Sequence, residues 1–215
     1  MKLALFPLHT VLFPGMTLPL QIFEPRYLEM IGQCLTQSQP FGVVLIDSGR
    51  EVGGPALPHS VGTVARITSV ERQGDGRLHI EAVGQQRFRL LDLHFDHPYL
   101  TGTIEEFPLA GAKDQPARQS ARALVPWLAR YLHLLGEAAE AQLHQQDLPH
   151  DPAGVGYLAA IVAQIPMLEK QALLATSTAT ELLQRERSIY RREISLMRAM
   201  LSSDRARAAT PFSPN

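Results

Sequence analysis

The chain has 215 residues, enough for one large domain or two small ones. Hydrophobic residues make up 45% and charged residues 19%, a balance typical of globular proteins with a substantial core. The net charge of −1 gives no electrostatic reason to expect nucleic acid or an anionic membrane as a partner. No stretch approaches the roughly 20 apolar residues of a membrane-spanning helix, and Pro7 interrupts the N-terminus too early for a signal peptide.

The first predicted elements lie in the stretch FPLHTVLFPGMTLPLQIFEPRY, residues 6–27. Proline removes a backbone donor, so it suits the ends of strands, turns and the first turn of a helix. We therefore predict an edge strand that ends at Pro7, a turn at Pro14-Gly15 into a second strand, and a helix with Pro25 at its first position.

The helix that follows Pro25 shows apolar residues at helical spacing. Its predicted buried face consists of Tyr27, Leu28, Ile31, Cys34 and Leu35. Cys34 is the single cysteine, which excludes an intrachain disulfide and fits a reducing compartment, so we expect a cytoplasmic protein. We interpret it as a small buried hydrophobe and not as a nucleophile.

Short alternating or apolar runs predict several strands before residue 107. These runs are Leu18–Phe23, Phe41–Asp47, Val61–Arg72, Leu78–Val83, Arg87–Leu93 and Tyr99–Glu105. Asp75-Gly76 between two of them is a hairpin signal. Short strands with Gly- and Pro-rich turns favour a small barrel or sandwich.

Beyond a linker at residues 111–116 the sequence reads as helical. The first helix has an apolar stripe, with Pro126 as its kink or true start and Gly136 as its end. The stripe consists of Ala121, Leu124, Val125, Leu128, Leu132 and Leu135. Further helices are predicted from Asp151 to Pro166, over Met167–Ala175 and over Thr178–Ser203. The fold class is therefore α+β, with a β domain at residues 1–110 and a helical bundle at 111–215.

Motifs for catalysis and for cofactors are missing from the sequence. It contains no phosphate-binding loop, no dinucleotide-binding glycine motif between a strand and a helix, and no G-x-S-x-G elbow. His94, Asp96 and His97 would need a bend to converge on a metal, so we interpret them as loop polarity. Lys170 near Ser177 is interpreted as part of an exposed helix face and not as a catalytic dyad. We predict no catalytic, cofactor-binding or metal-binding residue.

The last helix is rich in arginine, interleaved with glutamate. We interpret it as a solvated amphipathic helix packed on its neighbours. A helix that docks a partner or supports a homo-oligomer, and a nucleic-acid-binding helix, are the alternatives. The arginines are Arg185, Arg187, Arg191, Arg192 and Arg198.

The opening stretch resembles the start of the N-terminal domain of the ATP-dependent protease Lon. Three further blocks follow in the same order as in that family: VGTVARI at residues 61–67, AVGQQRFRLLDL at 82–93, and a looser helical block that begins with AAIVAQIPMLEKQALL. The resemblance covers residues 1–203. It implies a PUA-like β pseudo-barrel with one inserted helix, followed by a helical bundle.

In the full protease this region recognises substrate proteins and supports assembly. The resemblance therefore implies a non-catalytic module that binds protein or peptide segments, such as unfolded proteins or a separate protease. The ATPase and protease domains have no counterpart in this sequence, so we expect a stand-alone member of the kind labelled peptidase S16, Lon domain. A nucleic-acid-binding PUA-like protein and a residual hydrolase remain as alternatives.

Two residue sets follow from this interpretation. The opening motif is interpreted as a determinant of the fold, in which Phe23 packs ahead of the helix and Arg26 pairs with Glu24 or with a nearby strand carboxylate. It consists of Pro14, Gly15, Phe23, Glu24, Pro25, Arg26 and Tyr27. Apolar patches between barrel and bundle would contact the partner. The candidate partner-binding residues are Phe95, Tyr99, Phe107 and Trp127.

Overall fold

The structure is a computed structural model that describes residues 1–51, 56–139 and 148–208. The chain forms two compact units. The barrel unit comprises Met1–Ala110 and Ala160–Ser177, and the helical unit comprises Gly111–Ala159 and Thr178–Asn215. The sequence predicts that residues 160–177 belong to the helical bundle, but in the structure they belong to the same unit as the strands. The division into two domains at residue 110 stays a prediction.

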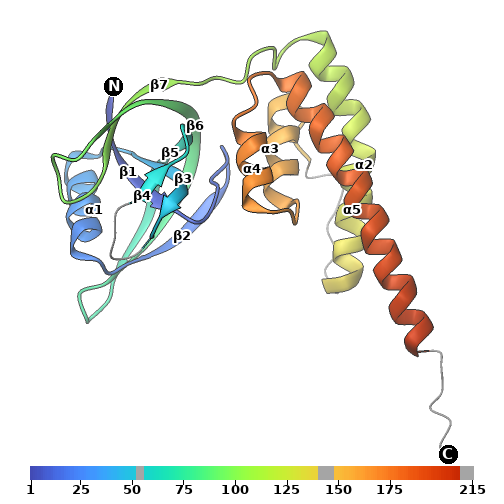
Figure 1. Ribbon diagram of the computed structural model, residues 1–215, viewed down its shortest axis with the longest axis horizontal. Coiled ribbons are helices and arrows are strands. Elements are labelled where there is room, and N and C mark those ends of the chain that lie inside the picture. Colours follow the sequence, from blue (N-terminus) through green and yellow to red (C-terminus); the bar gives the residue numbers. More distant parts are fainter. Residues whose placement is uncertain (52–55, 140–147, 209–215) are drawn as a thin grey trace, which may run out of the picture. The chain divides into compact units, whose positions relative to one another are not determined.

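Among the described residues, seven strands of the barrel unit form one sheet (Figure 1). Strand β1 pairs in parallel with β3 and antiparallel with β7, and the order β7-β6-β5-β3 completes a ring. The sheet therefore closes into a small barrel, with β2 added to β6 and β4 added to β3. This arrangement confirms the predicted α+β pseudo-barrel. The strands are β1 Lys2–Leu8, β2 Thr17–Ile22, β3 Phe41–Gly49, β4 Ala56–Pro58, β5 Val61–Arg72, β6 Leu78–His94 and β7 Thr101–Glu106.

The prediction that the first strand lies at an edge is wrong, because β1 has partners on both sides. Leu5 N donates to Leu100 O at 2.8 Å on the β7 side. The direction of the backbone N–H alternates along a strand, so the nitrogen of Pro7 faces the same side as that of Leu5. Pairing with β7 has ended there. The missing donor of Pro7 therefore removes no ladder hydrogen bond.

The predicted turn at Pro14-Gly15 is confirmed. Gly15 has φ +82°, and Met16 N donates to Phe13 O at 3.0 Å, as expected for a type II turn with proline at its second position. The turn lies against Gly84 of β6, where a Cβ atom would stand 2.3 Å from Phe13 O. Only glycine permits this close backbone approach.

Helix α1, Pro25–Gln37, begins at the predicted proline, with Glu24 as its N-cap residue in an extended conformation. The ring of Tyr27 stacks on Phe6 of β1, with 4.1 Å between the ring centroids. This contact joins the helix to the barrel. The buried residues of α1 are Tyr27, Met30, Ile31 and Cys34, whereas Leu28 and Leu35 are only partly buried.

Strand β6 continues through the point where two separate strands were predicted, so that prediction is wrong. Thr63 and Ala65 of β5 pair with Arg87 and Gly84 of β6, which leaves an extra residue on β6. The segment 84–86 is therefore a β-bulge and not a turn. The predicted hairpin before it is confirmed, since Gly76 has φ +85° between β5 and β6.

A buried arginine joins helix α4, Met167–Leu174, to the barrel. Arg87 Nη1 donates to Leu174 O at 2.6 Å and to Thr176 O at 2.7 Å. Gln171 Nε2 donates to Val61 O at 2.9 Å. A guanidinium is favourable at a helix C-terminus, where the carbonyl dipoles leave partial negative charge. These bonds explain why residues 160–177 belong to the barrel unit.

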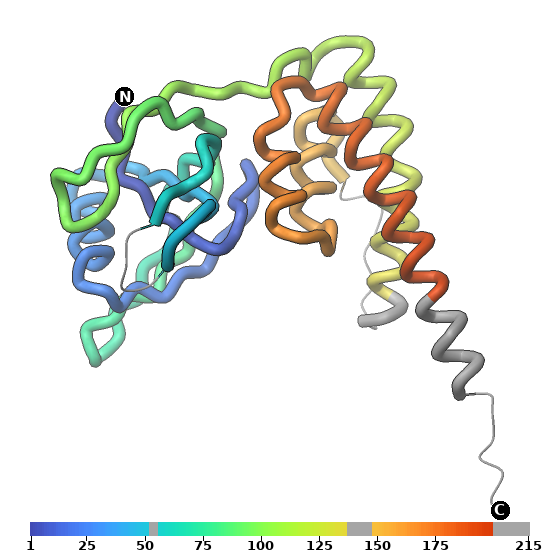
Figure 2. The backbone as a smooth tube through the Cα atoms, in the orientation of Figure 1, coloured from blue at the N-terminus to red at the C-terminus, as the bar shows by residue number. Residues whose placement is uncertain are grey.

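In the helical unit, α2 (Gln115–Ala139) and α5 (Ala179–Ala208) run side by side (Figure 2). Helix α3, Pro152–Val162, begins in this unit. The predicted stop at Gly136 is wrong, because α2 continues to Ala139 and Gly136 has no positive φ. Pro126 lies inside α2 on its exposed face, where water can pair the carbonyl that loses its donor. The buried stripe of α2 is Ala117, Ala121, Leu124, Leu128, Tyr131 and Leu134.

The core of the helical unit contains a buried carboxyl group. Glu186 on α5 is 1% exposed, and neither of its oxygens has a hydrogen-bond partner among the described residues. Burial holds the pKa of this carboxyl well above its usual range. One turn further along α5, Tyr190 packs edge-on against Tyr131, with centroids 4.9 Å apart, and donates to Ala159 O at 2.7 Å.

Replacement of Arg87 by methionine should destabilise the barrel unit by about 2–4 kcal/mol, because two carbonyl oxygens lose a charged donor. Arg89→Met is the matched control. Arg89 lies on the same strand and forms an exposed ion pair with Glu105 at 3.2 Å, a contact worth about 0–1 kcal/mol. Urea denaturation followed by circular dichroism measures the difference. Equal effects of the two substitutions would contradict the role assigned to Arg87.

The buried Glu186 predicts a stability that falls with pH. A carboxyl whose pKa is raised on folding binds its proton more tightly in the folded state. Its contribution is therefore complete below about pH 4.3, the unfolded pKa, and declines as the pH rises through the folded pKa. Glu186→Gln should remove this decline. The fluorescence of Trp127 on α2, the single tryptophan, reports the urea midpoint of the helical unit at each pH. Parallel pH profiles of the variant and wild type would refute this prediction.

Candidate functional site

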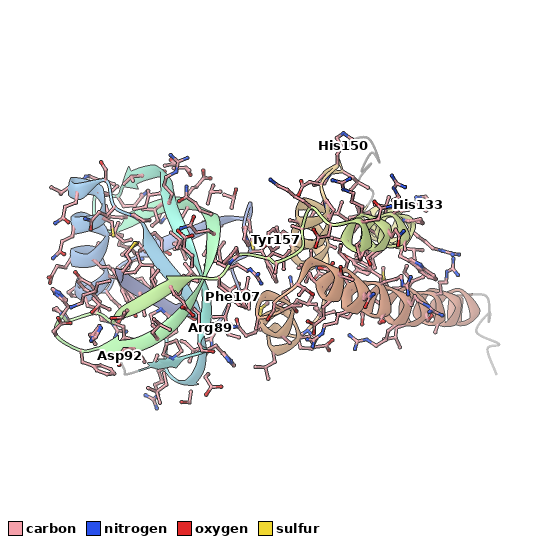
Figure 3. The ribbon with its side chains drawn as sticks, turned by 90° about the horizontal axis from the view of Figure 1, so that it is seen from above. Arg89, Asp92, Phe107, His133, His150 and Tyr157 are labelled. Atoms are coloured by element: carbon pink, nitrogen blue, oxygen red, sulfur yellow. The ribbon has the colours of Figure 1, made fainter. Side chains whose placement is uncertain are left out.

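The four predicted partner-binding aromatic residues fall in different places. Phe95 follows β6 and is 68% exposed, while Tyr99 is 5% exposed. Phe107 follows β7, and the guanidinium carbons of Arg87 and Arg89 lie 4.7 Å and 4.4 Å from its ring centroid. Arg89 and Phe107 are labelled in Figure 3. Trp127 belongs to the helical unit. Phe95 and Tyr99 are therefore the two predicted residues that meet at one site.

That site is a groove of about 580 Å³ in the barrel unit, which we call the aromatic groove. Its walls are mainly apolar, with a charged edge from the start of α1. Four residues of the opening motif, interpreted from the sequence only as fold determinants, line it. The lining residues are Pro7, Glu24, Pro25, Arg26, Tyr27, Ala56, Phe95, His97, Pro98, Tyr99 and Leu100.

The charged edge has a defined geometry. Arg26 Nε donates to Glu24 Oε2 at 3.1 Å, so Glu24 is the partner among the two predicted alternatives, and Arg26 Nη2 donates to Glu51 O at 3.2 Å. The guanidinium carbon lies 4.5 Å from the centroid of the Tyr27 ring. Burial raises the pKa of Tyr27, so its hydroxyl is neutral at physiological pH. The guanidinium of Arg26 is thus held at the rim of the groove, over the ring of Tyr27.

Hydrogen bonds also hold the opposite wall. Asp96, next to Phe95, lies 2.6 Å from Lys2 Nζ and accepts from the Thr101 hydroxyl at 3.1 Å. The hydrogen bond from Lys2 lowers the pKa of Asp96 to about 2, so the carboxylate keeps its charge under physiological conditions. Tyr99 donates its hydroxyl proton to Gln33 Oε1 at 2.8 Å. Phe95 is therefore presented to solvent by an anchored segment.

Phe23, expected to pack ahead of α1, is 50% exposed. Leu18 and Ile22 of β2 are buried, and residues alternate between the two faces of a strand, so Phe23 falls on the outer face. This alternation was the signal in the sequence that could have shown its exposure. Leu57 of β4 is 55% exposed. Both residues are chain neighbours of groove residues, Glu24 and Ala56.

The residues that the sequence analysis considered as metal ligands or as catalytic groups have other contacts. The described ranges contain no group of three or more His, Cys, Asp or Glu side chains that could hold a metal ion. The His97 ring stacks on Tyr99 at 5.2 Å, and Cys34 has a pKa raised to about 11 by burial. Lys170 was expected on an exposed face but is partly buried, and its Nζ donates to Ile161 O at 2.9 Å. Burial lowers the pKa of Lys170.

Over the described part of the chain, no helix has the length and apolar character needed to cross a bilayer.

Comparisons with known proteins agree with the resemblance of the opening motif. The Lon protease of Anaeromyxobacter dehalogenans (strain 2CP-C) is 29% identical over 199 residues, which cover 88% of this chain. This chain spans 24% of the length of that protease, and the same share of Lon protease 2 from Myxococcus xanthus.

Solved structures show the same fold. A Lon N-terminal domain protein from Xanthomonas campestris is 26% identical, with a TM-score of 0.63, over 86% of this chain and 96% of that one. The N-terminal domain of a Lon protease from the Mycobacterium avium complex is 18% identical, with a TM-score of 0.69, over 88% and 98%.

The family model for the ATP-dependent protease La (LON) substrate-binding domain matches residues 2–192. The chain belongs to this family.

Proposed function

We propose that this chain is a non-catalytic module that binds protein or peptide segments, and that the aromatic groove receives their apolar side chains. The family is described as a substrate-binding domain, which supports a binding role in place of catalysis. The observation on which the proposal rests is Phe95, 68% exposed at the edge of a mainly apolar groove.

The groove has properties that favour peptide binding. Exposed aromatic side chains that pack into apolar pockets supply much of the energy of protein interfaces. Because Asp96 is anchored to Lys2 and Thr101, the neighbouring Phe95 loses less conformational freedom on binding than a mobile side chain would. Arg26 adds a planar cation at the rim, suited to backbone carbonyls or carboxylates of a bound segment.

The partner we propose is a partly unfolded protein or an apolar segment of a specific protein, which includes a separate protease. Cytoplasmic location is part of this proposal, supported by the single, buried and unpaired Cys34. Nucleic acid is disfavoured because residues 1–110 contain eight basic and eleven acidic residues, a net charge of −3.

Binding of carboxymethylated lactalbumin, a permanently unfolded protein, tests the proposal. Phe95→Ser should weaken this binding at least about tenfold, as for loss of an aromatic hot spot. Leu91→Ser is the matched control, because Leu91 is 56% exposed on β6 and does not line the groove. Fluorescence anisotropy of the labelled lactalbumin measures both. An absence of micromolar binding, or an equal loss in the two variants, would overturn the proposal.

A further inference from the structure

The helical unit contains a second and larger hollow, of about 1,090 Å³, beside the first half of α2 and the start of α3. Its floor includes Ala121, Val125 and Val155, and one edge consists of Lys113, Arg118 and Arg122; we call it the basic groove. Its size is slightly above the roughly 300–1,000 Å³ found for ligand pockets. His150, labelled in Figure 3, also lines it.

Ion pairs are missing from this edge among the side chains that the structure describes. Lys113, Arg118 and Arg122 are exposed, and none forms an ion pair with a side chain in residues 1–51, 56–136 or 148–199. Arg118 and Arg122 lie one helical turn apart, a spacing at which like charges repel and destabilise the helix.

An arginine of the neighbouring helix α5 differs in this respect. On α5, Arg185 pairs with Glu181 at 2.7 Å at the same one-turn spacing. In the basic groove, Asp151 is the acidic lining residue, and its Oδ1 accepts from Gly154 N at 2.8 Å at the start of α3. The edge therefore has a net positive charge that a bound anion would neutralise.

The floor indicates the kind of anion. Val125 is partly exposed above the buried Ala121 and Val155, and the lining of the groove is mainly apolar. A free phosphate or a nucleic-acid backbone would leave this apolar lining uncovered, and the described lining residues include no Phe, Tyr or Trp to stack with a base. A peptide with both apolar and acidic side chains would cover the floor and pair with the edge.

The spacing of the cations agrees with such a peptide. The Cα atoms of Arg118 and Arg122 are about 6 Å apart along the helix axis. Alternate residues of an extended chain are about 6.6 Å apart and face the same side. We propose that the basic groove binds an acidic, apolar peptide segment of a partner protein, with carboxylates paired to Arg118 and Arg122 and apolar side chains on the floor.

This site lies in the helical unit and does not depend on the aromatic groove. The two proposals can therefore fail separately. Phe95→Ser should leave binding of an acidic peptide at the basic groove unchanged.

The test uses a fluorescein-labelled 12-residue peptide, Leu-Glu repeated six times, which places glutamates on alternate residues, and the full chain. The combined variant Arg118→Ala, Arg122→Ala should weaken binding at least about tenfold, and 200 mM salt should weaken it relative to 50 mM. Arg130→Ala is the matched control, since Arg130 is exposed on α2 outside the groove. Val125→Thr, which keeps the volume of the floor but adds a hydroxyl, should also weaken binding.

Two comparison ligands distinguish an acidic, apolar peptide from other possible occupants of the basic groove. A peptide with serine in place of each leucine should bind at least about tenfold more weakly than the leucine peptide. A 12-nucleotide single-stranded DNA should bind more weakly too. Tighter binding of the DNA, equal binding of the serine peptide, or an unchanged Kd in the double arginine variant would overturn the proposal.

Discussion

The guanidinium of Arg87 is buried in the barrel unit and donates to the carbonyl oxygens of Leu174, the last residue of α4, and of Thr176, which follows the helix. A buried guanidinium is costly unless its donors are used, so its position requires those carbonyls to be present. Residues 160–177 follow α2 and the start of α3 in the sequence. These bonds fix the segment to β6, and Gln171 provides a second link, to β5. The barrel unit is consequently assembled from two distant parts of the chain, residues 1–110 and 160–177.

Residues of the opening motif have more than one role. Tyr27 stacks on Phe6 in the core and also lines the aromatic groove. Arg26 is bonded to Glu24 and to the backbone of Glu51 while its plane covers Tyr27. The residues that start α1 therefore also shape the surface at which Phe95 is exposed. Because the proposed binding surface is built on a barrel and a helix start, it would need little ordering when a partner binds, which would lower the cost of association.

Local chemistry explains which features were predictable from the sequence. The turn at Gly15 and the helix start at Pro25 depend on the backbone limits of single residues, so residue type alone identifies them. The bulge at 84–86 and the interior position of β1 depend on pairing between strands distant in sequence, and no local pattern contains that information. The groove was missed for a similar reason. Tyr27 and Phe95 are far apart in the chain, and closure of the barrel brings them to one site.

Native-state hydrogen exchange of the backbone amides in α4 is the most direct test of a barrel unit that includes residues 160–177. If Arg87 and Gln171 fix α4 to the barrel, its slowest amides should open with the same free energy as those of β5 and β6. They should differ from the amides of α2 and α5. Exchange of α4 together with α2 and α5, or exchange at a much lower opening free energy than that of the strands, would contradict the account.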